Sequence, residues 1–188
     1  MDDIADEQLL EKYVKSGELR YFDALTRRYV GKVRAMIYPM VLNDADADEL
    51  TQDVFQQVVG NIHRFKGRSA FSTWLYRIAM NIAHNFLKRR TRNPVEHREN
   101  PPDSPGGKSW SPTETIMGME SDARVTKALE SLSPPLRAAI ALTAIQGFSI
   151  KEAAQVDHCL MATMYWRVHH ARKLLRKMLS EEDGIHEI

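Results

Sequence analysis

The sequence predicts an all-α protein made of two small helical domains joined by a flexible, proline-rich linker. Apolar residues recur every three or four positions on both sides of that linker, and no segment shows the alternating pattern of a β-strand. Residues 91–114 hold five of the eight prolines and few apolar side chains, which is typical of a tether. We expect a first domain over residues 1–92, a linker over 93–118 and a second domain over 119–188.

Length and composition limit the class of protein. The 188 residues are 43% hydrophobic and 8% aromatic, enough for one substantial core or two small ones. No apolar run approaches the roughly 18 residues of a membrane span, and the acidic start MDDIADEQ lacks the features of a signal peptide. We therefore expect a cytoplasmic protein without direct membrane insertion. The single cysteine, Cys159, excludes an intramolecular disulfide and fits a reducing compartment.

Four helices are predicted in the first domain, over residues 4–15, 18–42, 44–65 and 72–90. Pro39 lies late in the second helix, where the hydrogen bond that it cannot donate is expected to kink the helix or end it early. The third helix starts among aspartates, which suits the positive end of a helix dipole. Its inner face is predicted to carry Leu50, Val54, Val58 and Ile62.

The fourth helix is predicted to have a core face and an opposite polar face. The core face carries Trp74, Leu75, Ile78, Ile82 and Phe86, and the polar face carries Arg77, Asn81, His84 and Lys88. Such a polar face is most often only solvated. The preceding loop, however, offers two rings among three cations, namely Phe65 and Phe71 with Arg64, Lys66 and Arg68. Rings beside cations are typical of surfaces that capture single-stranded nucleic acid.

Capping signals define the helices of the second domain. Ser133 before a proline predicts a helix over 134–146 that stops at Gly147, and Ser149 forms a capping box with Glu152 for a short helix over 150–156. A third helix begins near residue 161, with an inward stripe at Met161, Met164, Val168, Ala171, Leu175 and Met178. This order predicts a helix-turn-helix, whose second helix enters the major groove of DNA.

The residues off that inward stripe are the candidate contacts to duplex DNA. They are Thr163, Tyr165, Trp166, Arg167, His169, His170 and Arg172. A small bundle with a merely solvated outer face is the alternative. An exposed Tyr-Trp-Arg group is costly without a partner, so DNA binding is favoured.

The net charge of +1 conceals charges that are sorted along the chain. Residues 64–92 and 158–180 carry lysines and arginines without any acid, which predicts two contacts with a polyanion. Residues 41–60 carry five acids without any lysine or arginine. That stretch would repel DNA and attract a basic protein surface.

Six motifs together resemble the bacterial extracytoplasmic-function (ECF) sigma factors, the smallest class of sigma subunit of RNA polymerase. In the first domain they are FDALTRRYVGKV, DADADELTQDVFQQV and FKGRSAFSTWLYRIAMNIAHNFLKRR. In the second they are LESLSPPLRAAIAL, GFSIKEAAQV and RVHHARKLLRKML. The resemblance implies a sigma-2-like helical bundle and a sigma-4-like helix-turn-helix. It implies a non-catalytic initiation subunit without a cofactor or a metal, and commonly one held inactive by an anti-sigma factor.

The resemblance also implies three binding surfaces. The contact to core RNA polymerase, on the clamp helices of its largest subunit, would use Asp46, Asp48, Glu49, Gln52, Asp53 and Gln56. Recognition and melting of the minus-ten promoter element would use Phe65, Lys66, Arg68, Ser69, Phe71, Trp74, Arg77, Asn81, His84, Asn85 and Lys88. Recognition of the minus-thirty-five element would use the seven candidates of the last helix, and the flap of the second-largest subunit would be a further partner.

Two departures from the family pattern stand out in the second domain. Asp157 and His158 replace the usual Leu-Gly of the turn, so a non-glycine residue is expected in a left-handed conformation. Tyr165 and Trp166 replace a basic and a small residue, so the preferred minus-thirty-five sequence is expected to be unusual.

Three other functions would each explain part of the sequence. A calcium loop beginning at Asp44 fails because its sixth position is Glu49 rather than glycine and its twelfth is Phe55 rather than glutamate. A sensor metal site at His158, Cys159, His169 and His170 is possible but disfavoured, because the adjacent His169 and His170 point about 100 degrees apart on a helix. A helix-turn-helix regulator acting at operators remains as the alternative, although it leaves the first domain without a role.

Overall fold

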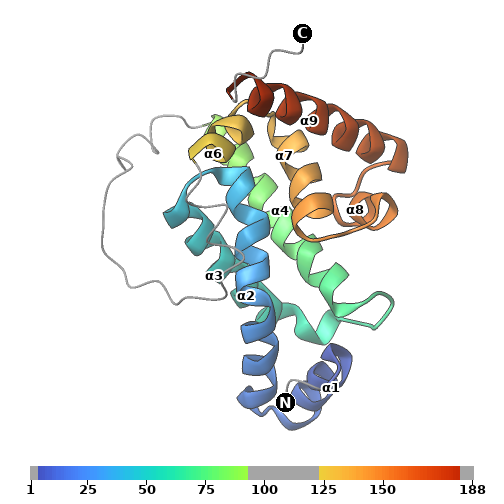
Figure 1. Ribbon diagram of the computed structural model, residues 1–188. Helices are drawn as coiled ribbons and strands as arrows, with labels where there is room; N and C mark the ends of the chain where they lie inside the picture. The colour runs from blue at the N-terminus through green and yellow to red at the C-terminus, as the bar shows by residue number, and fades with distance from the viewer. Residues whose placement is uncertain (1–3, 93–122, 183–188) are drawn as a thin grey trace.

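The computed structural model describes residues 4–92 and 123–182, and all regular elements within those ranges are helices (Figure 1). The predicted linker lies outside the described residues. The first domain contains α1 (Asp6–Ser16), α2 (Leu19–Val41), α3 (Asp44–Asn61), the 3₁₀ turn η1 (Ile62–Arg64) and α4 (Phe71–Arg92). The second contains α6 (Ala123–Glu130), α7 (Pro134–Ile140), the π turn η2 (Ala141–Ile145), α8 (Ile150–Val156) and α9 (Met161–Glu182). The all-α, two-domain prediction is confirmed.

Helix ends in the first domain follow local chemistry. Gly17 takes a left-handed φ of 70° and closes α1, because glycine adopts that conformation without a side-chain clash. The Asn43 side chain accepts a hydrogen bond from the Asp46 backbone and caps the start of α3. The second helix continues for two residues past Pro39, so the proline lies inside it and does not end it early.

The second domain departs from the predicted pattern at two elements. The sequence did not predict α6 as a separate helix. The predicted helix over 134–146 changes to a π turn at η2, where Gln146 N bonds the Ala141 carbonyl at 3.1 Å, before Gly147 stops it with a φ of 73°. The capping box at α8 is confirmed, since Ser149 and Glu152 exchange both hydrogen bonds.

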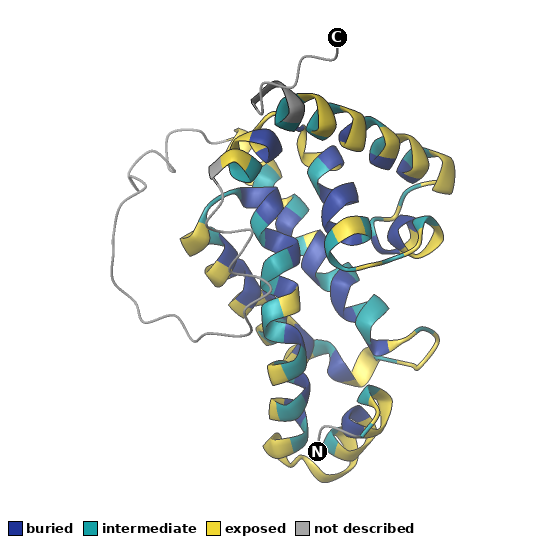
Figure 2. Ribbon diagram, viewed as in Figure 1, coloured by how far each residue is buried: buried dark blue, intermediate teal, exposed yellow. Residues whose placement is uncertain are grey.

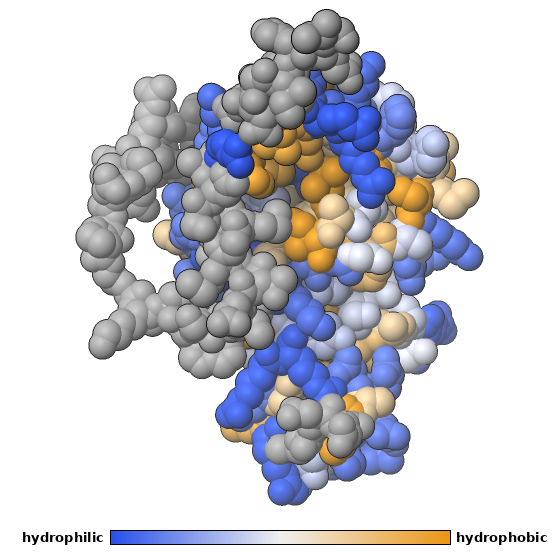
Figure 3. Space-filling view, in the orientation of Figure 1, coloured by the Kyte–Doolittle hydropathy of each residue, from blue (hydrophilic) through white to orange (hydrophobic). Residues whose placement is uncertain are grey.

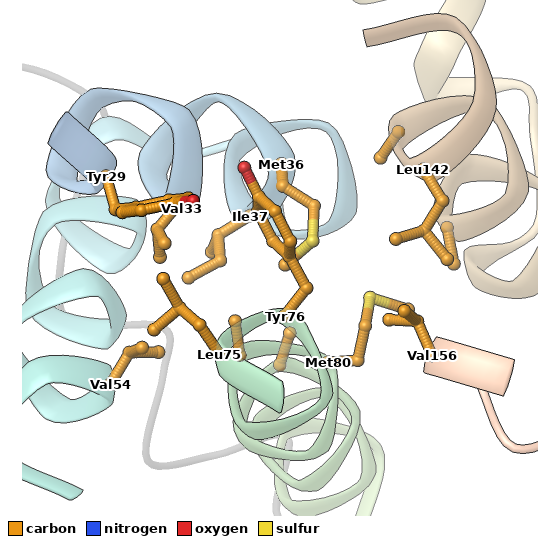
Figure 4. Packing of buried hydrophobic residues seen from close by; sticks show 14 of the residues in the cluster. Tyr29, Val33, Met36, Ile37, Val54, Leu75, Tyr76, Met80, Leu142 and Val156 are labelled. Atoms are coloured by element: carbon orange, nitrogen blue, oxygen red, sulfur yellow. The ribbon is translucent and has the colours of Figure 1, made fainter. Parts of the chain in front are cut away.

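The two domains share one hydrophobic core. Figure 1 shows α4 lying between α2 and α3 on one side and the second domain on the other. Met36, Tyr76 and Met80 of the first domain join the same buried cluster as Leu142 and Val156 of the second (Figure 4). Figure 2 shows buried residues along these facing helices and exposed residues on the outer surfaces.

The position of α4 between two partners corrects its predicted core face. The fully buried side chains are Phe71, Leu75, Tyr76, Ala79, Met80 and Ala83. The predicted Trp74, Ile78, Ile82 and Phe86 are only partly buried. A helix that packs on two sides buries a wider arc than the single stripe assumed from its periodicity.

A smaller cluster stabilises the far side of the second domain. It contains Leu129, Leu132, Leu136, Ile140 and Ala171. The cluster ties α6 and α7 to α9 and so fixes the helix that follows the turn. Among the described helices, none combines the length and the apolarity that crossing a membrane requires.

Candidate nucleic-acid and protein interfaces

An acidic stripe lies on the outer face of α3. Glu49, Gln52, Asp53 and Gln56 are exposed and recur at helical spacing, so they point the same way. Val59, the next residue along this face, is also exposed. Within the described part of the chain, Glu49 and Asp53 have no ion-pair partner. These two carboxylates therefore provide the charge of the stripe.

The other acids of this segment are already paired. Arg34 of α2 bonds Asp48 at 2.5 Å and Asp44 at 2.6 Å, and Arg90 of α4 contacts Asp46 at 3.2 Å. These contacts hold α3 against α2 and α4. Asp46 and Asp48, both predicted to dock on a partner, therefore share their charge with arginines of the same chain, which weakens their pull on a basic surface.

The aromatic loop before α4 is built into the core. The ring centroids of Phe65, Phe71 and Trp74 lie 5.4–6.1 Å from one another. Phe71 is buried, and its backbone N–H donates to Glu7. Its ring therefore belongs to the core and is not accessible to a base. Phe65 and Trp74 keep part of their surface open. Lys66 and Arg68 are exposed on the loop, and Ser69 is half-buried.

The polar face of α4 is divided between solvent and the second domain. Asn81, Asn85 and Lys88 are exposed. Arg77 donates from Nε to the Gln155 carbonyl at 3.1 Å, and His84 lies against the turn after α8. In this arrangement the two asparagines and the lysine are accessible, while Arg77 and His84 are engaged by the chain itself.

A buried carboxylate organises the turn of the helix-turn-helix. Asp157 has a side chain only 2% exposed, and it accepts from Arg167 Nη1 at 2.5 Å while His84 Nε2 lies 2.7 Å from its other oxygen. His158 follows with a φ of 50°, the left-handed conformation expected at this position. Asp157 thus joins the turn, α9 and the first domain, and it holds Arg167 back against the turn.

A second interdomain contact centres on Gln146. Its Oε1 accepts from the Tyr76 hydroxyl at 2.6 Å, and its Nε2 donates to the Lys32 carbonyl at 2.8 Å. Phe148 packs edge-on against the Tyr76 ring at 5.3 Å. Burial raises the pKa of the Tyr76 phenol, which keeps this donor protonated.

The outer face of α9 is apolar at its start and basic farther along. Tyr165, Trp166, His169 and Arg172 are exposed, while Thr163, Arg167 and His170 are half-buried. Met161 is exposed, so its predicted place on the inward stripe was wrong, whereas Met164, Val168 and Ala171 are buried as predicted. Lys173 and Arg176 continue the exposed face and were missing from the candidate set, although their spacing from His169 and Arg172 could have revealed them.

Within the described residues, the remaining reactive groups form no second site. Burial, with the nearby Asp157 charge, raises the pKa of the Cys159 thiol and makes it a poor nucleophile. In residues 4–92 and 123–182 no three His, Cys, Asp or Glu side chains are grouped so as to hold a metal ion.

Comparison with known proteins identifies relatives for both domains. Residues 25–93 match the family described as Sigma-70 region 2, and residues 122–175 match Sigma-70, region 4. The RNA polymerase sigma-H factor of Pseudomonas aeruginosa is 33% identical over 181 residues, 93% of each chain. The ECF RNA polymerase sigma-E factor of Escherichia coli K12 is 32% identical over 182 residues, 93% of this chain and 95% of the relative.

Solved structures share the fold over nearly the whole chain. CnrH, solved in complex with the cytosolic domain of CnrY, is 25% identical with a TM-score of 0.69, covering 95% of this chain and 99% of that one. The sigma factor RpoE of Bartonella quintana, solved with the anti-sigma factor NepR, is 24% identical with a TM-score of 0.68, covering 85% and 96%.

Proposed function

The chain belongs to the ECF sigma factors of the sigma-70 family, and from this membership we propose how its three surfaces direct transcription initiation. A sigma factor gives RNA polymerase its choice of promoter, and it is an initiation factor instead of a catalyst. The proposal is that the acidic stripe of α3 binds core polymerase, that the loop and α4 bind the minus-ten element, and that α9 binds the minus-thirty-five element. This work takes place in the cytoplasm, where the polymerase acts.

One observation carries the proposal: a single chain holds an acidic helix, an amide-rich face and a basic helix-turn-helix on separate surfaces. The acidic stripe would meet the clamp helices of the largest subunit through charge complementarity. The exposed Asn81 and Asn85 can each donate to and accept from the edge of an unstacked base. The exposed cations Arg172, Lys173 and Arg176 suit the phosphates of a duplex. The second domain would also contact the flap of the second-largest subunit.

The experiment that tests this arrangement is a binding measurement with purified core polymerase. Replacing Asp53→Lys reverses one of the two unpaired carboxylates, so affinity for core should fall about tenfold. Asp23→Lys makes the same charge change at an exposed residue of α2 and serves as the matched control. Equal affinity of both variants and the parent chain would remove the α3 stripe from the core contact.

We also propose control by an anti-sigma factor that covers these surfaces. The support is the likeness to CnrH, whose structure was solved with the cytosolic domain of CnrY. Affinity purification of the tagged chain from its own cells should recover a stable protein partner that blocks core binding in vitro. Recovery of core polymerase alone, under all growth conditions, would count against such control.

The operator-binding regulator is the rival function, and it is not favoured. It would use the helix-turn-helix and leave α3 and α4 without a role. A regulator of that kind would bind specific duplexes equally well with and without core polymerase. The sigma factor proposed here would require core polymerase for specific promoter recognition.

A further inference from the structure

The start of α9 presents an unusual amount of exposed apolar surface. Leu160, Met161, Tyr165 and Trp166 are 75%, 60%, 65% and 59% exposed. Apolar side chains left in water forgo the free energy that burial would return, so a contiguous group of four indicates a surface that becomes covered. In Figure 3 orange side chains reach the surface at the right-hand edge, near the junction of α8 and α9.

The first turns of α9 also lack a free cation. Arg167 is the only lysine or arginine between residues 161 and 171, and its guanidinium is bound to Asp157 in the turn. The outward cations begin at Arg172, three turns into the helix. Guanine is read most often by an arginine or lysine that reaches its O6 and N7 atoms. The first turns of this helix therefore provide no arginine or lysine that could make this contact to guanine.

The indole ring at this end is stacked on a neighbouring side chain. The indole of Trp166 stacks on the imidazole of His170, with centroids 4.9 Å apart and planes 12° apart. The stack fixes the indole before any DNA arrives, so little side-chain entropy is lost when it makes contact. Tyr165 is the preceding residue of the helix.

We propose that Met161, Tyr165 and Trp166 determine specificity by contacting the 5-methyl groups of thymines in the minus-thirty-five element. Thymine is the one base that shows an apolar group in the major groove, and apolar side chains are its natural contacts. The inference rests on the proposed function, since it names the chemistry that the recognition helix reads. Arg172 and the cations after it would hold the phosphates and add affinity without choosing bases.

The test uses the holoenzyme formed from the full chain and core polymerase. A pool of promoter-length duplexes, randomised over the upstream half, is selected for holoenzyme binding, and the enriched sequence becomes the probe. Single thymines of its minus-thirty-five element are then replaced by deoxyuridine, which removes the methyl group and keeps every hydrogen-bonding atom. Replacing a contacted thymine by deoxyuridine should lower the affinity about fourfold, which corresponds to the free energy of burying one methyl group.

Variants of the chain assign the effect to the rings. Trp166→Ala should weaken binding to the thymine duplex and bring its affinity close to that of the deoxyuridine duplex. Arg172→Ala should weaken both duplexes equally and preserve their ratio, because its target is phosphate. Both residues are exposed, so neither change should disturb the fold, and circular dichroism provides the check.

The outcomes separate the inference from the proposed function. An enriched minus-thirty-five element whose binding is indifferent to every methyl group overturns methyl readout and leaves the sigma function intact. A thymine-to-deoxyuridine ratio that Trp166→Ala does not change also overturns it. Failure of the holoenzyme to enrich any sequence would contradict the proposed function itself, and methyl readout with it.

Discussion

At the scale of single residues, Asp157 links the turn, α9 and the first domain. It is a buried carboxylate with a cation from α9 on one oxygen and an imidazole from α4 on the other. Buried charges persist in proteins when they are paired and hydrogen-bonded, as this one is. The family resemblance flagged Asp157 as an odd residue for the turn. Its role was invisible in the sequence because His84 lies 73 positions away.

The pKa of the Cys159 thiol depends on the charge of the Asp157 carboxylate. Asp157→Asn should lower the Cys159 pKa, because a nearby negative charge that opposes the thiolate is removed while Arg167 remains. More thiolate would then be present at pH 8, and alkylation by iodoacetamide should be faster. The rate is measured on the folded chain with Asp23→Asn as the control. An unchanged or slower rate would contradict the placement of Asp157 beside the thiol.

Replacing Asn81 tests whether the exposed polar face of α4 contacts promoter DNA. Asn81→Ala should leave core binding unchanged and lower open-complex formation about tenfold, since an amide contact to a base edge is lost. Permanganate footprinting of melted thymines measures the open complex directly. Gln8→Ala removes an exposed amide from α1 and should have no effect. Normal promoter opening by the Asn81 variant would exclude it from the minus-ten contact.

At the scale of elements, features that depend on nearby residues were predictable from the sequence, and features that depend on tertiary packing were not. Caps were predictable, because Ser149, Glu152 and Gly147 act within a few residues of themselves. The start of α9 was predictable too, whereas the π turn at η2 was not. That turn lies where the chain packs against α2, so a tertiary contact and not a local propensity selects it. On the exposed α9 face, Tyr165, Trp166, His169 and Arg172 were predicted, whereas Met161 was wrongly predicted on the inward stripe and Lys173 and Arg176 were not predicted.

The capping box makes α8 sensitive to mutation and to acid. Ser149→Ala should cost about 1 kcal/mol of stability, because the backbone N–H of Glu152 loses its acceptor. Hydrogen bonds from Ser149 lower the Glu152 pKa in the folded chain. The stabilisation by Glu152 is therefore present above the unfolded pKa of about 4.3 and is lost as pH falls through the lower, folded value.

Urea unfolding measures both effects, with Ser133→Ala as the matched control, because this serine at the N-cap of α7 makes no side-chain capping hydrogen bond. The stability difference between the parent chain and Glu152→Gln should shrink as pH falls from 6 to 3. A difference that stays constant over this range would contradict the stabilising role of the carboxylate.

At the scale of the whole molecule, the two domains form one body with a continuous core. The sequence predicted each domain by its own pattern but gave no sign of their contact, since residues such as Tyr76 and Gln146 carry no local signal of pairing. The contact engages Arg77 and His84, two of the minus-ten candidates, in hydrogen bonds to the second domain. Use of these residues on DNA therefore competes with their bonds to the second domain.

Gln146 provides the cleanest test of that contact because it belongs to none of the proposed binding surfaces. Gln146→Ala removes the bonds to Tyr76 and Lys32, each worth about 1 kcal/mol, and should raise the population of separated domains. Small-angle scattering should then give a larger radius of gyration than for the parent chain. Gln57→Ala, an exposed amide of α3, is the control. Identical scattering from both variants would contradict a role for Gln146 in holding the domains together.

The promoter-selecting role of this chain is tested by in vitro transcription. Core polymerase from the source bacterium is incubated with a library of genomic promoter fragments, with and without the purified chain. A sigma factor should produce start sites that appear only when the chain is added, with a shared element upstream of each. An unchanged set of transcripts, together with no binding of the chain to core, would contradict this role.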